Sequence, residues 1–299
     1  MKMTNFRTSS EIGSISHIVG EESAVELVAM AGFDAWDFSL FDMWRWDKKN
    51  NRAFVSTHPL SSSEYLAFSR RLRRIGENCG IRCNQSHAPH PSVPCGIDNL
   101  LRSIECTAEV GAEICVIHPD NNSTPEQNAE MYLKLLPYAK ACGVKIATEN
   151  MWNWNKELDV ASPAACSSAE SFIAHLKSVD DPYFVACLDI GHAEMRGLNS
   201  SASEMIYALG DKLCALHIHD NRCLPDKDDH LLPFDGNIDF DKVASFIAQS
   251  GYEGTVMLEV GKNVTKDGES VYGGISDEEY VLRAIESANR LLEMINSKR

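Results

Sequence analysis

Short apolar runs alternate with longer amphipathic segments along most of the chain. Each run is only a few residues long and largely apolar, as expected for strands of a parallel sheet that is covered on both faces. We predict eight strands, at Ile12–Ser16, Ala35–Leu40, Ile81–Gln85, Ile114–His118, Val144–Glu149, Phe184–Asp189, Cys214–His219 and Thr255–Val260. The pattern therefore indicates an α/β protein that repeats a strand-then-helix unit.

The segments between these strands carry helix start and stop signals. Thr124 precedes Pro125 as a helix cap followed by a first-turn proline, and this helix is predicted to stop at Gly143. Further helices are expected at Ser61–Asn78, Ser167–Val179, Ser203–Leu209, Phe240–Gln249 and Asp277–Asn296. Eight βα units, with no glycine-rich phosphate loop after the first strand, favour one (β/α)₈ TIM barrel over a doubly wound sheet. We expect a single domain over residues 1–299.

Composition narrows the classes of partner. The chain has 28 Lys and Arg against 43 Asp and Glu, a net charge of −15. This charge argues against a nucleic-acid partner, because binding to a phosphate backbone needs basic side chains. No apolar run approaches the roughly 20 residues of a membrane span, and no signal peptide is evident at the start. Ten cysteines without a C-x-x-C pair indicate reduced thiols rather than disulfides or a zinc site. We expect a cytoplasmic protein with no nucleic-acid or membrane partner.

Polar side chains end most of the predicted strands, where a barrel places its active site. Buried acids and neutral imidazoles on one rim need a cation, and oxygen and nitrogen donors without thiolates suit Mn²⁺, Co²⁺, Mg²⁺ or Zn²⁺. The most compact ligand set is Glu149, Asp189, His217 and Glu259. Any one of these residues alone would more often be a loop cap or a satisfied polar group, so the prediction rests on all four together.

Other side chains on the same rim are predicted to contact a substrate. They are His87, His118, Trp152, His192, His219, Arg222 and His230. His217 and His219 are two residues apart and share a strand face, so both point inward or both outward. Two alternatives stay open: Trp152 can be a platform for a sugar or a loop-packing residue, and Arg222 can bind substrate or form a surface salt bridge.

Four motifs together resemble the xylose-isomerase-like TIM barrels. They are Thr148-Glu149-Asn150, Cys187–His192, His217–Asn221 and Leu258-Glu259-Val260, and Asp228–Phe240 resembles a loop of the same family with Phe234-Asp235 in place of its glycine-containing part. The superfamily includes sugar and sugar-phosphate isomerases, ketose 3-epimerases, inosose-pathway enzymes and metal-dependent AP endonucleases. The resemblance implies a divalent metal on Glu149, Asp189, His217 and Glu259.

The resemblance also implies a reaction. In its sugar enzymes the two glutamates, here Glu149 and Glu259, act as acid and base on a metal-stabilised enediolate of a sugar or polyol, often in a dimer or tetramer. The sugar, its phosphorylation and the choice between isomerase and epimerase stay open. The absence of an obvious basic clamp favours an unphosphorylated substrate.

Two alternative functions remain. The AP endonucleases hold three zinc ions, with extra ligands at the motif positions that are occupied here by His87, His118, His192, Asp228 and His230. The net charge of −15 and the lack of a basic stripe argue against a DNA groove. A barrel subunit without catalysis is the third possibility, and the cost of burying unused charges argues against it.

Overall fold

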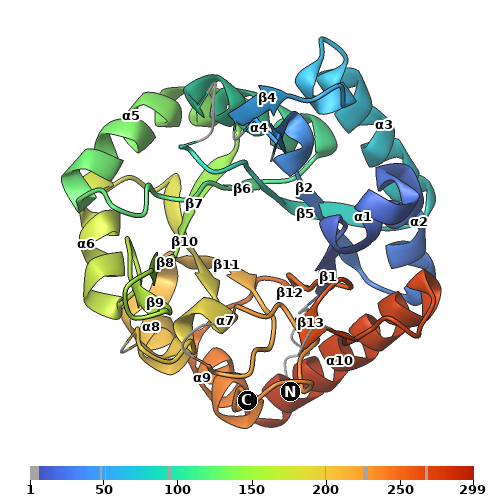
Figure 1. Ribbon diagram of the computed structural model, residues 1–299. Coiled ribbons are helices and arrows are strands. Elements are labelled where there is room, and N and C mark those ends of the chain that lie inside the picture. Colours follow the sequence, from blue (N-terminus) through green and yellow to red (C-terminus); the bar gives the residue numbers. More distant parts are fainter. Residues whose placement is uncertain are drawn as a thin grey trace.

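Eight parallel strands form the wall of a barrel in the computed structural model, which describes residues 7–47, 49–50, 52–92, 96–198, 200–224, 228–266 and 269–299 (Figure 1). Their order around the wall is β11-β10-β7-β6-β5-β2-β1-β12. The strands are β1 (Thr8–Glu11), β2 (Ala35–Ser39), β5 (Arg82–His87), β6 (Ile114–Val116), β7 (Lys145–Glu149), β10 (Phe184–Asp189), β11 (Leu213–His217) and β12 (Val256–Leu258). Ile218, directly after β11, closes the barrel by pairing with β12. Its N–H donates to the Met257 carbonyl at 2.9 Å, and its carbonyl accepts from Glu259 N–H at 3.0 Å. The predicted TIM barrel is confirmed.

Helices surround this wall (Figure 1). They are α2 (Glu21–Ala31), α3 (Tyr65–Asn78), α4 (Gly96–Val110), α5 (Pro125–Cys142), α6 (Ala169–Val179), α8 (Ala202–Leu209), α9 (Phe240–Ser250) and α10 (Asp277–Ser297), with the short α1 (Gly13–Val19) and α7 (Ile190–Ala193) above the strand ends. The local signals of α5 are confirmed. Thr124 Oγ1 accepts from Gln127 N–H, Gln127 Oε1 accepts from Thr124 N–H, and Gly143 ends the helix at a φ of 70°. No helix in the described part of the chain combines the length and apolar character needed to cross a bilayer.

The predicted first strand is wrong. The strand is β1, and most of Ile12–Ser16 belongs to α1 instead. All four residues of β1 are polar and buried, and some of their hydrogen-bond partners lie on other strands or loops: Ser9 Oγ donates to Asn84 Oδ1 at 2.6 Å, and Thr8 N–H donates to Asp34 Oδ2 at 2.9 Å. An apolar run therefore could not mark this strand.

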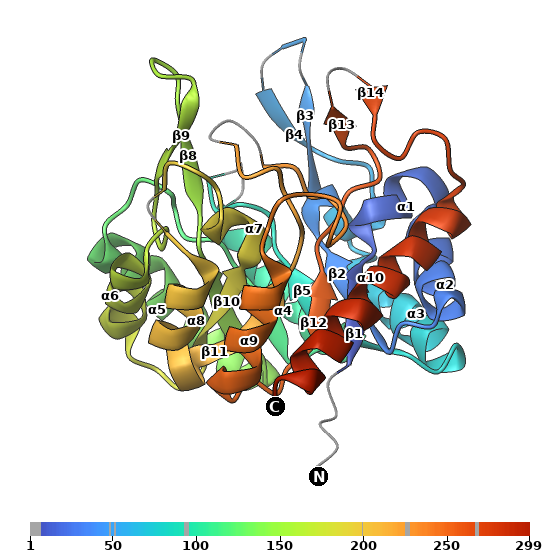
Figure 2. The ribbon, with the colours of Figure 1, turned by 90° about the horizontal axis from the view of Figure 1, so that it is seen from below.

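Three hairpins that the apolar pattern did not predict project from one face of the barrel (Figure 2). They are β3 (Trp44–Asp47) with β4 (Arg52–Val55), β8 (Trp152–Asn155) with β9 (Val160–Pro163), and β13 (Thr265–Lys266) with β14 (Glu269–Ser270). This face is opposite the C-terminus and carries the carboxyl ends of the barrel strands (Figure 2). The hairpins thus stand around the region where the sequence places its polar residues.

Candidate metal centre and active site

The barrel interior changes from apolar to polar towards the carboxyl ends of the strands. A small apolar cluster of Val116, Ala147, Val185, Cys187 and Ala215 fills the inside of the wall. Side chains two residues apart along a strand share a face. Glu149, Asp189 and His217 each follow a member of this cluster by two residues, so they point inward directly above it.

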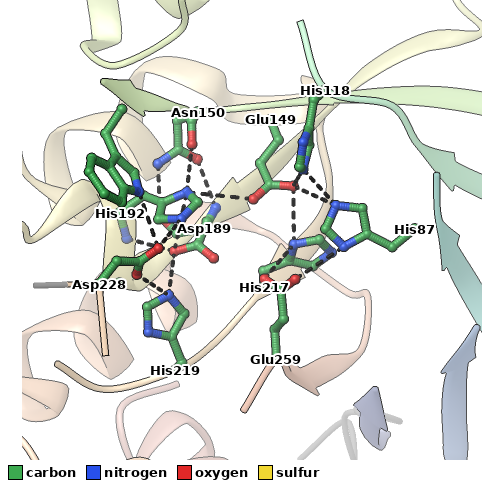
Figure 3. Close-up of polar contacts among 12 residues, drawn as sticks. His87, His118, Glu149, Asn150, Asp189, His192, His217, His219, Asp228 and Glu259 are labelled. Carbon is green, nitrogen blue, oxygen red and sulfur yellow. Dashed lines mark hydrogen bonds and ion pairs between the residues drawn. The ribbon is translucent and has the colours of Figure 1, made fainter. Parts of the chain in front are cut away.

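The four predicted metal ligands meet at this level (Figure 3). His217 Nδ1 lies 3.1 Å from Glu149 Oε2 and 3.1 Å from Glu259 Oε2. One donor atom from each of these residues and from Asp189 lies within 4.8 Å of all the others. Glu149, Asp189 and His217 are fully buried, and Glu259 is 7% exposed.

Several donor atoms of this group have no hydrogen-bond partner among the described residues. They are both carboxylate oxygens of Glu149, Asp189 Oδ2 and both ring nitrogens of His217. Buried polar atoms are rarely left unsatisfied in native proteins. Converging oxygen and nitrogen atoms of this kind fit a divalent cation, which would satisfy them together.

Electrostatics keep the two glutamates ionised. Burial alone would raise the pKa of Glu149, but the imidazoles of His217 and His118 outweigh burial and hold this pKa well below its usual range. Burial is likewise outweighed at Glu259, where His217 and His87 hold the pKa well below its usual range. Both carboxylates are therefore available at neutral pH to bind a cation or to accept a proton.

A second ligand group surrounds Asp228 and contains His192, His219 and His230. Asp228 Oδ2 lies 3.1 Å from His192 Nε2 and 3.3 Å from His230 Nε2. The other ring nitrogen of each histidine lies 2.9 Å from a backbone carbonyl, of Asn150 for His192 and of Glu259 for His230. Metal-binding histidines usually donate their second N–H in this way, so these two residues are arranged as ligands as well as possible substrate contacts.

A third group joins His87 and His118 to Glu149. The Nε2 atoms of His87 and His118 are only 2.6 Å apart, and His118 Nε2 lies 3.3 Å from Glu149 Oε2. His87 Nδ1 also lies 3.1 Å from Glu259 Oε1. Glu149 is therefore shared between the third group and the four-residue group.

A pocket of about 670 Å³ opens above these groups. Glu149, Glu259 and His192 contribute to its lining. Trp152 lines it too, and its indole N–H donates to Asp228 Oδ2 at 3.1 Å, so the ring is held at the pocket wall. Phe41 forms another apolar part of the wall, with its ring centroid 4.8 Å from that of His87.

Comparison with known proteins identifies the family. The sequence model of a family described as xylose isomerase-like TIM barrel matches residues 25–296. The chain belongs to this family. An uncharacterized protein of Methanocaldococcus jannaschii is 24% identical over 262 residues, which cover 81% of this chain and 79% of that protein.

Solved structures similar to this xylose isomerase-like barrel include sugar epimerases. A D-tagatose 3-epimerase-like protein aligns with a TM-score of 0.70 at 20% identity, over 98% of this chain and 99% of that one. D-psicose 3-epimerase from Clostridium cellulolyticum H10 aligns with a TM-score of 0.73 at 15% identity, over 97% and 99%. At these identities the likeness shows a shared fold.

Two predicted substrate contacts do not line the main pocket of this xylose isomerase-like barrel: His219, which is fully buried, and Arg222. The Arg222 guanidinium binds Asp229 through two contacts, Nε to Oδ2 at 2.9 Å and a terminal nitrogen to Oδ1 at 2.5 Å. Arg222 lines a different pocket together with Leu224 and Val271. The salt bridge that the sequence left open as an alternative is present.

Two residues that the sequence did not assign to the site hold it in place. Asn150 Oδ1 accepts from Asp189 N–H at 2.8 Å, and Asn150 Nδ2 donates to the Asp189 carbonyl at 2.9 Å. Asp189 Oδ1 in turn accepts from His192 N–H at 2.6 Å. Asp220 accepts four backbone N–H groups, those of Asn221, Phe234, Gly236 and Ile238.

Asp220 therefore organises the loop that carries Asp228 and His230. Asp220→Asn replaces one acceptor oxygen by an amide that faces backbone donors, and we expect it to lower the free energy of unfolding by about 2–4 kcal/mol. Urea unfolding followed by circular dichroism measures this loss. Asp211→Asn, at an exposed position, serves as the control. A urea unfolding midpoint of Asp220→Asn equal to that of the control variant would contradict the prediction.

The loop includes a residue in an unfavourable backbone conformation. Phe234 has a φ of 77°, a region that favours glycine. Two contacts of the Phe234 side chain offset the cost of this backbone conformation. The Arg290 guanidinium carbon lies 3.8 Å from the Phe234 ring centroid, and Phe240 packs on the same ring. The contacts of Arg290 and Phe240 thus hold the Phe234 ring in place in this loop.

Gly191 leaves room for His219. A Cβ atom at Gly191 would lie only 1.8 Å from His219 Cε1. We expect Gly191→Ala to displace this imidazole, to destabilise the fold by about 1–3 kcal/mol and to reduce the bound metal per chain. Thermal melting and elemental analysis measure both effects. Gly274→Ala, where no atom lies within 4 Å of the added Cβ, is the matched control, and identical behaviour of the two variants would refute the clash.

Sequence reasoning also missed two buried acids beside Glu259. Glu11 ends β1 and is level with Asp37 on the neighbouring β2. Glu11 lines the pocket, whereas Asp37 is fully buried. Correct placement of the first strand at Thr8–Glu11 would have marked Glu11 by the same strand-end rule that marked Glu149 and Glu259.

Proposed function

We propose that this protein is a divalent-metal-dependent sugar isomerase or epimerase. The observation that carries the proposal is the placement of Glu149 and Glu259 against one imidazole, each with a carboxylate oxygen 3.1 Å from His217 Nδ1, at the floor of a pocket. The sugar epimerases that share the fold make a sugar or polyol the preferred substrate class. Assembly as a homodimer or tetramer is part of the same proposal.

Glu149, Asp189, His217 and Glu259 would hold the cation. When bound, it would polarise a substrate carbonyl and the hydroxyl on the neighbouring carbon, and so acidify the C–H bond of that hydroxyl-bearing carbon. Three carboxylates and one imidazole suit Mn²⁺, Co²⁺, Mg²⁺ or Zn²⁺.

The two glutamates perform the proton transfers in this proposal. Both carboxylates are ionised because imidazoles hold their pKa values low, so either can accept the proton of the acidified C–H bond. Return of the proton from the carboxyl group to the other carbon, together with transfer of the hydroxyl proton to the former carbonyl oxygen, gives isomerisation. For epimerisation the opposite glutamate must first take up a proton from solvent; it then donates that proton to the other face of the same carbon, and the first glutamate releases to solvent the proton that it accepted.

The test is solvent exchange into a sugar. Protein loaded with Mn²⁺ or Co²⁺ is incubated with a panel of ketoses and aldoses in deuterium oxide, and deuterium at carbon is followed by NMR. We expect incorporation next to the carbonyl carbon of at least one sugar, with none in protein stripped of metal. Metal-loaded protein that exchanges no sugar in the panel would overturn the proposal.

A multi-metal phosphodiesterase is the second candidate, because one observation favours it. The groups around Asp228 and around His87 and His118 lie beside the four-residue group, so the ligands suffice for more than one cation. A net charge of −15 opposes binding to a phosphate backbone. Metal counting together with a mobility shift on abasic DNA separates the candidates: three zinc ions per chain with tight DNA binding would favour the nuclease, and absence of DNA binding would favour the sugar enzyme.

A further inference from the structure

The pocket extends well beyond the metal-ligand groups. Part of its wall comes from Gly13, Ser14 and His17 of α1, and part from the segment after β12 that contains Lys262, Asn263 and Val264. His17 Nε2 and Asn263 Nδ2 are in contact, which joins these two walls. Pockets of roughly 300–1,000 Å³ typically hold drug-sized ligands, so a pocket of about 670 Å³ has room for a ligand of two sugar units.

Glu11 lies between the metal-ligand groups and this outer wall. It is 8% exposed and lines the pocket, yet its Oε1 has no hydrogen-bond partner among the described residues. Glu11 comes one position after Ser10, which pairs with Leu258, and Glu259 comes one position after Leu258, so Glu11 and Glu259 are level with each other. A buried carboxyl oxygen without a partner is costly, so this atom is placed to bind something that enters the pocket.

The charges around Glu11 favour a neutral ligand. Glu11 and Glu259 lie level with each other on neighbouring parts of the barrel wall, so two carboxyl groups line this part of the pocket. Lys262 is the one lysine on the described pocket wall, and its ammonium is paired with Asp277. A phosphate group in this part of the pocket would lie beside these acids while Lys262 is already paired, whereas a sugar hydroxyl group can donate a hydrogen bond to a carboxylate without adding charge.

We propose that Glu11, Ser14, His17 and Asn263 form a subsite, here called the β1 subsite, that binds a second sugar unit. The substrate is then a disaccharide or other glycoside whose reacting sugar lies over the metal ligands. This inference rests on the proposed function and specifies its substrate class. Glu11 contributes a hydrogen bond to a hydroxyl of the second unit.

The experiment compares one ketose with and without a second sugar. Binding of D-fructose and of the keto-disaccharides isomaltulose, turanose and leucrose to Mn²⁺-loaded protein is measured by calorimetry. We expect at least one disaccharide to bind about tenfold tighter than fructose, and Glu11→Leu to bring that ratio towards one. Asn263→Ala, on the other side of the subsite, should reduce the ratio by severalfold, and the exposed Glu130→Gln should leave it unchanged.

The outcomes separate the two proposals. Absence of binding by fructose and by all three disaccharides would contradict the sugar enzyme itself. Binding of fructose as tight as that of every disaccharide would leave the sugar enzyme standing and overturn the β1 subsite. A ratio that survives in Glu11→Leu and in Asn263→Ala would also overturn it. Should Glu11→Leu fail to fold, the isosteric Glu11→Gln, which keeps one acceptor, is expected to lower the ratio partly.

Discussion

Glu149→Gln is expected to reduce solvent exchange into the sugar by about a thousandfold, because it removes a proton-accepting carboxylate. It should also lower the number of metal ions per chain. Glu149 Oε2 lies 3.1 Å from His217 Nδ1, 3.3 Å from His118 Nε2 and 3.6 Å from His87 Nε2. This one oxygen atom therefore contacts three imidazoles. NMR exchange rates and elemental analysis measure the two effects.

Glu259→Gln provides the matched comparison. Its carboxylate contacts two imidazoles, those of His217 and His87, whereas the Glu149 carboxylate contacts three imidazoles through one oxygen atom. We therefore expect a similar loss of exchange but a smaller loss of metal than in Glu149→Gln. Wild-type exchange rates in either variant at full metal occupancy would exclude that glutamate as the acid or base.

The convergence of Glu149, Asp189, His217 and Glu259 could be predicted because two simple rules applied to these residues. Barrel strands carry functional residues at their carboxyl ends, and side chains alternate along a strand. Glu149, Asp189 and His217 end clear apolar runs, so both rules gave their level and their inward direction. The geometry brings these residues together with Glu259, as the sequence led us to expect.

The parts that escaped prediction depend on contacts between distant residues. The first strand consists of buried polar residues whose partners, such as Asn84 for Ser9, lie far along the chain, so its pattern is not apolar. Misplacing that strand concealed Glu11. The role of Asp220 was hidden for a different reason, because a carboxylate that binds four backbone N–H groups leaves no spacing signal in the sequence.

The geometry also refines what the histidines can do. The sequence assigned His192 and His230 to the substrate, and the structure places both against Asp228 with their other nitrogens at backbone carbonyls. That arrangement fixes which ring nitrogen faces the pocket. A residue of this kind can hold a cation and still lie next to the substrate, so the two roles are compatible.

Removal of divalent ions is expected to lower the melting temperature by roughly 10 °C. An ion present at a thousand times its dissociation constant stabilises the folded state by about 4 kcal/mol, and each kcal/mol corresponds to about 2–4 °C in a large domain. The physical reason is that Glu149, Asp189 and His217 are fully buried with donor atoms that no described residue satisfies. Thermal melting with and without a chelator, then with Mn²⁺ or Co²⁺ restored, measures the effect.

The double variant Glu149→Gln, Glu259→Gln is the control for this melting experiment. It removes two anionic ligands, so restored metal should raise its melting temperature by much less than it raises that of the wild type. A wild-type protein whose melting temperature is the same with chelator and with saturating metal would show that these side chains do not hold a cation. The buried carboxylates would then be stabilised by protonated imidazoles alone, since His217 already lies within 3.1 Å of both Glu149 and Glu259.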